Sequence, residues 1–151
     1  MAKSPPKTVA LNHDDMLAEY VGRLADGRQF YLTTASVESE YLFGDTSKAF
    51  IALYIFDKAG QLQSATIDFL GPKETLDEVA RTSRRDALLA SLGPFKYQRI
   101  KVAPFRIEMF EVEFGFIPLP PKEPGDEWAV IVKPDENMCF WPPWTSGKYD
   151  Y

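Results

Sequence analysis

Side chains suited to catalysis are few in this 151-residue chain. His13 is the sole histidine, so Ser-His or Cys-His catalysis would have to use this residue. Cys139 is the sole cysteine, which excludes an internal disulfide and a multi-cysteine metal site. It has no basic neighbour in the sequence that would lower the pKa of its thiol. We interpret Cys139 as a small buried apolar residue and His13 as a solvated one.

Acidic residues form two groups with a spacing that invites a chemical interpretation. Asp14 and Asp15 could contribute to a cation site, but adjacent side chains point in different directions and no third ligand is nearby in the sequence. Glu108, Glu111 and Glu113 could act as paired carboxylates, although alternation along a half-exposed strand explains them more simply. No glycine-rich phosphate-binding motif occurs. The sequence therefore predicts no catalytic residue, no metal site and no cofactor.

The basic residues do not suggest a nucleic-acid partner. Arg81, Arg84 and Arg85 form a cluster, but Glu78 and Asp86 are interspersed with them, and we assign the arginines to the solvent face of a helix. The net charge of −5 works against a surface that neutralises phosphates. An acidic surface instead suits the capture of a basic protein.

The residues best suited to binding follow Cys139 at the C-terminus. Two tryptophans flank Pro142-Pro143, a pair that fixes φ twice and removes two backbone donors. The rings of this tail either cover the protein's own sheet or anchor a partner, and the sequence leaves both interpretations open. We expect Trp141, which still belongs to a strand, to be structural. The predicted partner-binding residues follow it: Trp144, Tyr149, Asp150 and Tyr151.

Hairpins are the main elements that must position these residues. Residues 50–56 are apolar on both faces, as in a central strand, and a turn at 57–60 leads into residues 62–69. Two further hairpins are predicted, one joining residues 18–24 to 28–34 through Gly27 and one joining 128–132 to 138–141. Residues 37–48, between the hairpin of residues 18–34 and that of residues 50–69, are predicted to form a surface loop.

Residues 97–116 also have strand character, interrupted by Pro104. The apolar alternation changes phase near Met109-Phe110, and one inserted residue explains such a change, so we predict a β-bulge there. The prolines between residues 118 and 124 predict an extended linker.

One helix is predicted, at about residues 76–92. Thr75 and Glu78 match a capping box at its start, and Gly93-Pro94 would end it. Its apolar stripe consists of Leu76, Val79, Ala80, Ala87, Leu88 and Leu92.

One helix among about eight hairpin-linked strands indicates an α+β fold, with a curved, mostly antiparallel sheet and the helix packed on one face. Residues 1–13 are expected to be a flexible lead-in, and residues 14–151 a single domain. The sequence lacks an apolar segment of the ~18 residues that span a bilayer and a signal-peptide pattern, so we expect a cytoplasmic protein without membrane contact.

Three segments carry a resemblance to a known family. They are residues 26–30, residues 54–62, and the ending Phe140-Trp141-Pro142-Pro143-Trp144 with Gly147, Tyr149 and Asp150. The chain is similar in these segments to a family of small bacterial cytosolic proteins, some of which are labelled formate hydrogenlyase regulatory protein. The resemblance implies a regulator that acts on a transcription factor through protein contact.

These observations together predict a non-enzymatic protein-binding module of a bacterium, either a regulator or a toxin-neutralising immunity-type protein. The alternative is a small-molecule-binding or hydrolytic domain with a pocket on the concave face of the sheet. Two carboxylates converging in such a pocket, for example Glu108 with Asp68, would favour the alternative. The sequence leaves the identity of the partner and the oligomeric state open.

Overall fold

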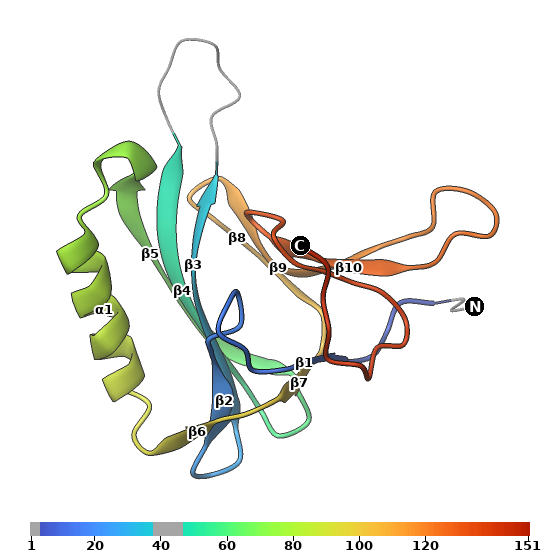
Figure 1. Ribbon diagram of the computed structural model, residues 1–151, viewed down its shortest axis with the longest axis horizontal. Helices are drawn as coiled ribbons and strands as arrows, with labels where there is room; N and C mark the ends of the chain where they lie inside the picture. Colours follow the sequence, from blue (N-terminus) through green and yellow to red (C-terminus); the bar gives the residue numbers. More distant parts are fainter. Residues whose placement is uncertain (1–3, 38–46) are drawn as a thin grey trace.

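Two antiparallel sheets lie against each other, and one α-helix, α1 (Glu78–Ala90), covers the outer side of the larger sheet (Figure 1). The structure is a computed structural model and describes residues 4–37 and 47–151. Its strands and single α-helix confirm the predicted α+β class. The predicted loop at 37–48 lies, except for its ends, outside the described residues.

The larger sheet has five strands in the order β5-β4-β3-β2-β6, and every neighbouring pair is antiparallel. The β2–β3 and β4–β5 connections are the first two predicted hairpins. Gly27 in the first turn has a φ of +93°, a value that glycine adopts without strain. The strands are β2 (Tyr20–Leu24), β3 (Gln29–Val37), β4 (Lys48–Phe56), β5 (Leu62–Pro72) and β6 (Phe95–Tyr97).

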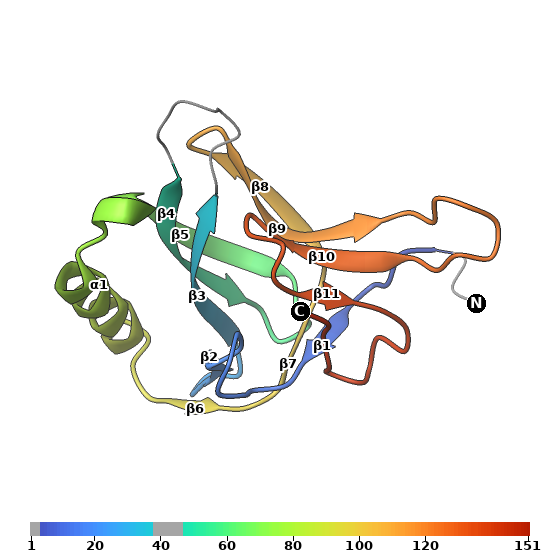
Figure 2. The same ribbon diagram turned by 45° about the horizontal axis from the view of Figure 1, so that its top comes forward.

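The smaller sheet has four strands in the order β11-β10-β9-β8, and two further strands, β1 and β7, pair beside it (Figure 2). The β10–β11 connection is the last predicted hairpin. The strands are β8 (Phe105–Met109), β9 (Val112–Leu119), β10 (Ala129–Lys133), β11 (Cys139–Phe140), β1 (Val9–Leu11) and β7 (Ile100–Val102).

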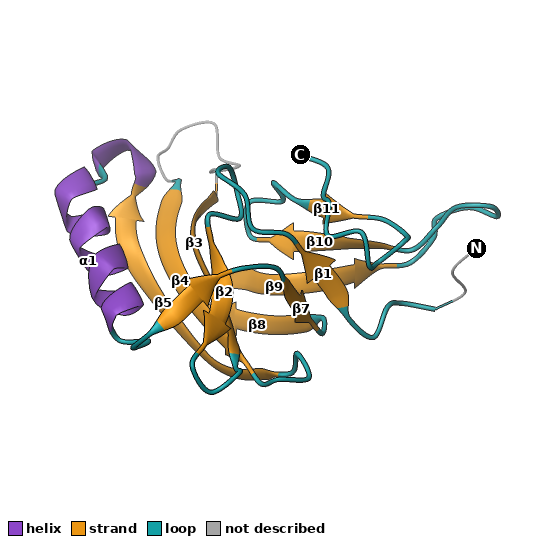
Figure 3. Ribbon diagram, turned by 60° about the horizontal axis from the view of Figure 1, so that its bottom comes forward, coloured by secondary structure: helices purple, strands orange, loops and turns teal. Residues whose placement is uncertain are grey.

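Strand β4 is buried on both faces, which confirms its predicted central position. Phe50 belongs to the core between the sheets, where its ring meets Phe114 edge-on with the centroids 5.1 Å apart. Ile51 and Leu53 point to the opposite face and cluster with Leu88 of α1. The larger sheet thus separates two apolar clusters, and the helix lies along one side of the strands (Figure 3).

The flexible lead-in predicted for residues 1–13 is wrong from Val9 onward. Val9 and Leu11 are fully buried in β1, which pairs with β7. The prediction weighed the prolines and polar residues before this segment and missed three consecutive apolar residues, which are enough for a short strand in a core.

Two details of the strand region also differ from the prediction. Phe110 and Glu111 have φ of +57° and +61°, so they form a tight turn between β8 and β9, and no bulge is needed to explain the phase change. Pro118 belongs to β9 and lies opposite Val130 of β10, so the linker starts later than expected.

The helix is shorter than predicted and begins differently. A 3₁₀ turn, η1 (Lys73–Thr75), precedes it. Its N-cap is Asp77, whose carboxylate accepts hydrogen bonds from the N–H groups of Val79 and Ala80 at 3.0 and 3.1 Å, so the capping box of Thr75 and Glu78 is not formed. Gly93 has a φ of +71°, although the C-cap is Ser91. In the described residues, no helix has the length and apolar character needed to cross a membrane.

The predicted orientation of the helix is correct at Leu88 and Leu92, which pack on the larger sheet, but wrong elsewhere. Val79, assigned to the buried stripe, is 79% exposed, and Leu88 is the one buried residue of α1. The arginines assigned to the solvent face turn toward the sheet instead: Arg84 pairs with Asp68 of β5, and Arg85 lies over the ring of Tyr20. The inner face of α1 therefore combines leucine with the apolar stems and charged heads of arginines.

Candidate functional site: the open edge of strand β3

The predicted binding residues of the tail lie largely against the protein itself. Trp144 and Tyr149 are half-buried and pack on the core between the sheets. Trp141 is 46% exposed, so the expected division between a structural Trp141 and a projecting Trp144 is reversed. Asp150 exchanges two backbone hydrogen bonds with Cys139, of 2.8 and 2.9 Å, whereas Tyr151 is 83% exposed.

The tail docks on β1 and on Asn12, the residue that follows it (Figure 2). The N–H of Ala10 donates to the carbonyl of Trp144 at 3.0 Å, and that of Asn12 donates to the carbonyl of Gly147 at 2.9 Å. Gly147 has a φ of +77°, and a Cβ there would lie 2.2 Å from Oδ1 of Asn12. Glycine is favoured here because other residues are strained at this φ, and a side chain would displace the Asn12 amide, which donates to the carbonyl of Ser146 at 3.3 Å.

Tyr149 holds a tight turn at residues 14–18. Its hydroxyl donates to Oδ2 of Asp14 at 2.6 Å and accepts from the N–H of Leu17 at 3.3 Å. Oδ1 of Asp14 accepts from the N–H groups of Met16 and Ala18 at 2.8 and 3.0 Å. Both carboxylate oxygens are therefore engaged within the protein, and in the described residues no three His, Cys, Asp or Glu side chains are grouped to hold a metal ion.

The ionisation of this contact agrees with its geometry. Partial burial alone would raise the pKa of Asp14, but the hydrogen bonds from Tyr149, Met16 and Ala18 outweigh it and lower the pKa below the usual range. Burial, followed by the hydrogen bond to Asp14, raises the pKa of Tyr149 to about 12. At neutral pH the contact joins a carboxylate to a neutral phenol.

Residues 14–18 form a turn and do not pair with β3, so β2 begins only at Tyr20, opposite Leu32. Met16 and Leu17 of this turn line the first hollow together with Thr33 and Thr34. Strand β3 continues for five more residues and pairs there with β4 alone. In the described part of the chain, no strand pairs with Thr33–Val37 on the side of β2. We call this segment the open edge.

The hydrogen-bonding direction of the open edge follows from its neighbours. The carbonyl of Val21 accepts from the N–H of Gln98 on the β6 side, so Tyr20 and Gly22 direct their backbone groups toward β3. Phe30 and Leu32 face them, and strand alternation then turns the N–H and C=O groups of Thr34 and Ser36 toward the open side. The hydroxyl of Thr33 donates to the carbonyl of Thr34 at 3.2 Å, a local bond within the edge.

Exposure along β3 changes at the same position. Residues 29–32 are all buried, whereas residues 33–37 are half-buried or exposed. The change coincides with the last residue that β2 pairs, so loss of the neighbouring strand accounts for it.

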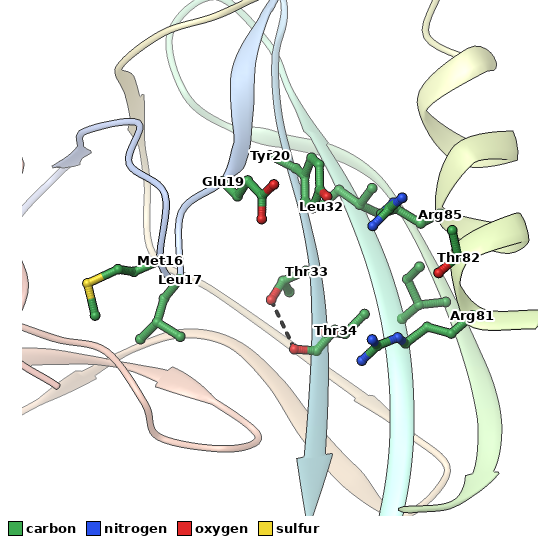
Figure 4. A pocket seen from close by; sticks show the side chains of 11 residues that line it. Met16, Leu17, Glu19, Tyr20, Leu32, Thr33, Thr34, Arg81, Thr82 and Arg85 are labelled. Atoms are coloured by element: carbon green, nitrogen blue, oxygen red, sulfur yellow. Dashed lines mark hydrogen bonds between the residues drawn. The ribbon is translucent and has the colours of Figure 1, made fainter. Parts of the chain in front are cut away.

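Three hollows border the open edge. The first, of about 200 Å³, lies between the edge and α1, with Leu32 and Ile51 among its lining residues. Figure 4 shows Arg81 and Arg85 reaching from the helix toward β3. The second, of about 170 Å³, is lined by Arg81 and by Asp135 of the β10–β11 loop, and the third, of about 40 Å³, lies on the side of the smaller sheet.

The two walls of these hollows differ in charge. Arg81 lines the first and second hollows and pairs with Glu78, an exposed residue of its own helix. The guanidinium of Arg85 lies 5.4 Å from the centre of the Tyr20 ring. Asp135 lines the second and third hollows, and desolvation by burial raises the pKa of its carboxyl. The helix wall is basic, and the opposite wall carries a desolvated carboxyl group together with Lys133, which pairs with Glu136.

The other residues considered for catalysis do not gather at one site among the described residues. His13 stacks on Tyr97 with the ring centroids 5.1 Å apart. Burial, and then the charge of Asp150, raises the pKa of Cys139, the reverse of what a nucleophilic thiol needs. Glu113 pairs with Arg106 at 3.0 Å, and Glu111 lies in the exposed turn after β8.

Glu108 and Asp68 do not share a pocket. Glu108 is exposed on β8 in the smaller sheet. Asp68 pairs with Arg84 of α1, on the face of the larger sheet that points away from β8. The pair of carboxylates that would favour a hydrolytic site is therefore not formed.

Sequence reasoning missed the open edge and its arginine wall. Arg81, Arg85, Leu88 and Leu92 have the i, i+4, i+7, i+11 spacing of one helix face, and this mixed stripe was a usable signal. The change from Phe30-Tyr31-Leu32 to Thr33-Thr34-Ala35-Ser36 was another, because it marks a fall in hydrophobicity inside one strand.

Comparison with protein families, curated proteins and solved structures gave no match to this chain.

Proposed function

We propose that this protein is a non-enzymatic binding module that captures an extended segment of another protein as an added strand on the open edge of β3. The observation that carries the proposal is the row of outward backbone groups at Thr34 and Ser36, which continues the line along which β2 pairs with β3. In strand addition, main-chain hydrogen bonds supply affinity and flanking pockets supply specificity. A regulator or a toxin-neutralising immunity-type protein of a bacterium needs no more than such a contact.

The open edge is well prepared for this role. β4 fixes its conformation along its whole length, so a bound segment meets a strand that is already formed. The turn at residues 14–18, held by Tyr149, keeps these residues from pairing with the edge as a strand. In this proposal Tyr149 positions the binding site from within the fold, while the exposed ring of Tyr151 remains available to a partner.

The hollows favour side chains over a whole small molecule. The pocket beside α1 holds about 200 Å³, below the roughly 300–1,000 Å³ of typical small-molecule sites. Hollows on both sides of one strand also match the alternating side chains of an inserted segment.

A proline in the open edge tests the proposal directly. Ser36→Pro removes an N–H that points to the open side while leaving the groups that pair with β4, and proline is tolerated at such edge positions. A phage library of random peptides of about ten residues serves as the probe, because it assumes no particular partner. We expect wild-type protein to enrich extended peptides, and Ser36→Pro to weaken their binding at least about tenfold, since one or two hydrogen bonds and the strand register are lost.

Ala65→Pro is the matched control. Tyr31 directs its backbone groups to β4 and pairs with Tyr54, whose partner on β5 is Ala65, so Ala65 directs its N–H away from the sheet on the far edge. This variant should keep the affinity of the wild type. A library that yields no enriched peptide, or peptides that bind Ser36→Pro as tightly as wild type, would contradict strand addition at this edge.

A further inference from the structure

The walls beside the open edge carry opposite charges, which constrains what can bind between them. Arg81 and Arg85 reach toward the edge from α1 on one side of the larger sheet. Asp135 lines the third hollow, on the side of the smaller sheet, and it meets Arg81 across the second hollow. Lys133, which also lines the third hollow, pairs with Glu136, so its charge is already matched. Glu19 also lines the first hollow and offsets part of its positive charge. Arg81 lines both the first and the second hollow, so it is the main basic group beside the edge.

An added strand would present its side chains to these walls in turn. Successive residues of a strand point to opposite faces of the sheet. Residues at one parity would therefore face α1 and its arginines, and residues at the other parity would face Asp135. Opposite charges on neighbouring residues of the segment would match the two walls, and like charges would not.

We infer that the open edge selects segments in which an acidic residue and a basic residue occupy adjacent positions, the acidic one facing Arg81 and the basic one facing Asp135. This inference rests on the proposed function, because it specifies the partner of the same edge. The overall negative charge suggested a partner that is basic as a whole. The inference is narrower, because it requires one basic side chain at a defined position and an acidic side chain next to it.

The acidic residue and the basic residue of the bound segment should contribute differently to the binding free energy. Arg81 is about one-third exposed and already pairs with Glu78. A carboxylate of the bound segment beside Arg81 therefore adds little binding free energy, because solvent screens the charge pair. Asp135 is more deeply placed. Its carboxyl group accepts a hydrogen bond of 3.4 Å from the N–H of Asn137, but it is costly to leave ionised without a counter-ion. Loss of the basic residue should therefore weaken binding more than loss of the acidic one.

The test uses the enriched peptides and three variants of the full chain. Arg81→Gln and Asp135→Asn each remove the charge of one wall. Arg84→Gln is the matched control, because Arg84 lies on the same helix but pairs with Asp68 and does not line the hollows beside the edge. Each enriched peptide is compared with an isomer in which its acidic and basic residues are moved to positions of the same parity.

We expect the enriched peptides to carry opposite charges at adjacent positions and to bind about fivefold more tightly than their isomers. Arg81→Gln and Asp135→Asn should each reduce this preference, and Arg84→Gln should leave it unchanged. Peptides that lose binding in Ser36→Pro but show no charge alternation would overturn the charge inference and leave strand addition in place. Peptides indifferent to Ser36→Pro would instead remove the proposed function, and with it the inference.

Discussion

The two halves of β3 belong to one strand with one register, yet they differ in strand pairing and in burial. Residues 29–32 are paired on both sides and buried. Residues 33–37 keep the same pairing with β4 but are half-buried or exposed. The difference shows that the boundary between core and surface in this sheet is set by where β2 begins, since β3 itself continues without a break.

Amide hydrogen exchange should give the largest contrast between the two halves. Leu32 and Thr34 are two residues apart, but Leu32 directs its N–H to β2 and Thr34 directs its N–H to the open side. We expect Leu32 to be protected up to the global free energy of unfolding, about 5–15 kcal/mol, and Thr34 to exchange with little protection. Exchange measured by NMR checks this, and equal protection of the two amides would show that another segment covers the edge.

Side-chain truncation should separate the halves next. Phe30 is fully buried and packs edge-on against Phe95 with the ring centroids 5.0 Å apart. Phe30→Ala should lower the free energy of unfolding by about 3–5 kcal/mol. Thr34→Ala, in the exposed half, should change it by less than about 0.5 kcal/mol. Urea unfolding of both variants measures the difference, and a loss above 2 kcal/mol at Thr34 would mean that the open half is structurally buried.

The tail variants sharpen the comparison because the tail determines where β2 can begin. Trp144 packs on the core and Trp141 is 46% exposed. Trp144→Ala should therefore cost about 2 kcal/mol, less than a fully buried tryptophan, and Trp141→Ala less than about 0.5 kcal/mol. Thermal melts of the two single variants decide between them. A Trp141→Ala variant that melts at the lower temperature would contradict the docking of the tail.

The contact between Tyr149 and Asp14 should give the smallest effect, and it depends on pH. The pKa of Asp14 is lowered in the folded protein, so its carboxylate contributes stability above the unfolded pKa of about 3.9, and this contribution disappears as the pH falls through the folded value. We expect Asp14→Asn to be about 1 kcal/mol less stable than wild type at pH 6, since solvent partly screens the carboxylate. Near pH 2 the two proteins should be equally stable. Asp15→Asn, a change at the exposed neighbour, should show no such dependence in urea unfolding at the two pH values.

Local signals explain which parts of the fold could be predicted. The turn at Gly27 and the two-sided apolar pattern of residues 50–56 each depend on a few consecutive residues, and the structure confirms both. The apolar stripe proposed for α1 was correct at Leu88 and Leu92 but wrong at Val79. Arginine stems can cover a sheet as leucine does, and a binary pattern counts them as polar.

The open edge could not be predicted in the same way, because it depends on a contact between distant residues. Tyr149 and Asp14 are 135 positions apart, and their hydrogen bond belongs to the turn that ends the pairing of β2 with β3. No local pattern reports such a contact. The sequence drew attention to the tail as a binding segment and to Asp14-Asp15 as a possible cation site, but it did not indicate that they meet.

The composition of the open edge also bears on how the protein behaves at high concentration. An unpaired strand is a template for a second copy of the same chain, and aggregation through such edges is a general hazard. Here Thr33-Thr34-Ala35-Ser36-Val37 has no charged side chain. A second copy that added its own residues 33–37 as a strand would bring no basic side chain to Asp135, and this carboxyl group would lose contact with water without gaining a counter-ion. Asp135 therefore discourages the protein from polymerising by pairing one open edge with another.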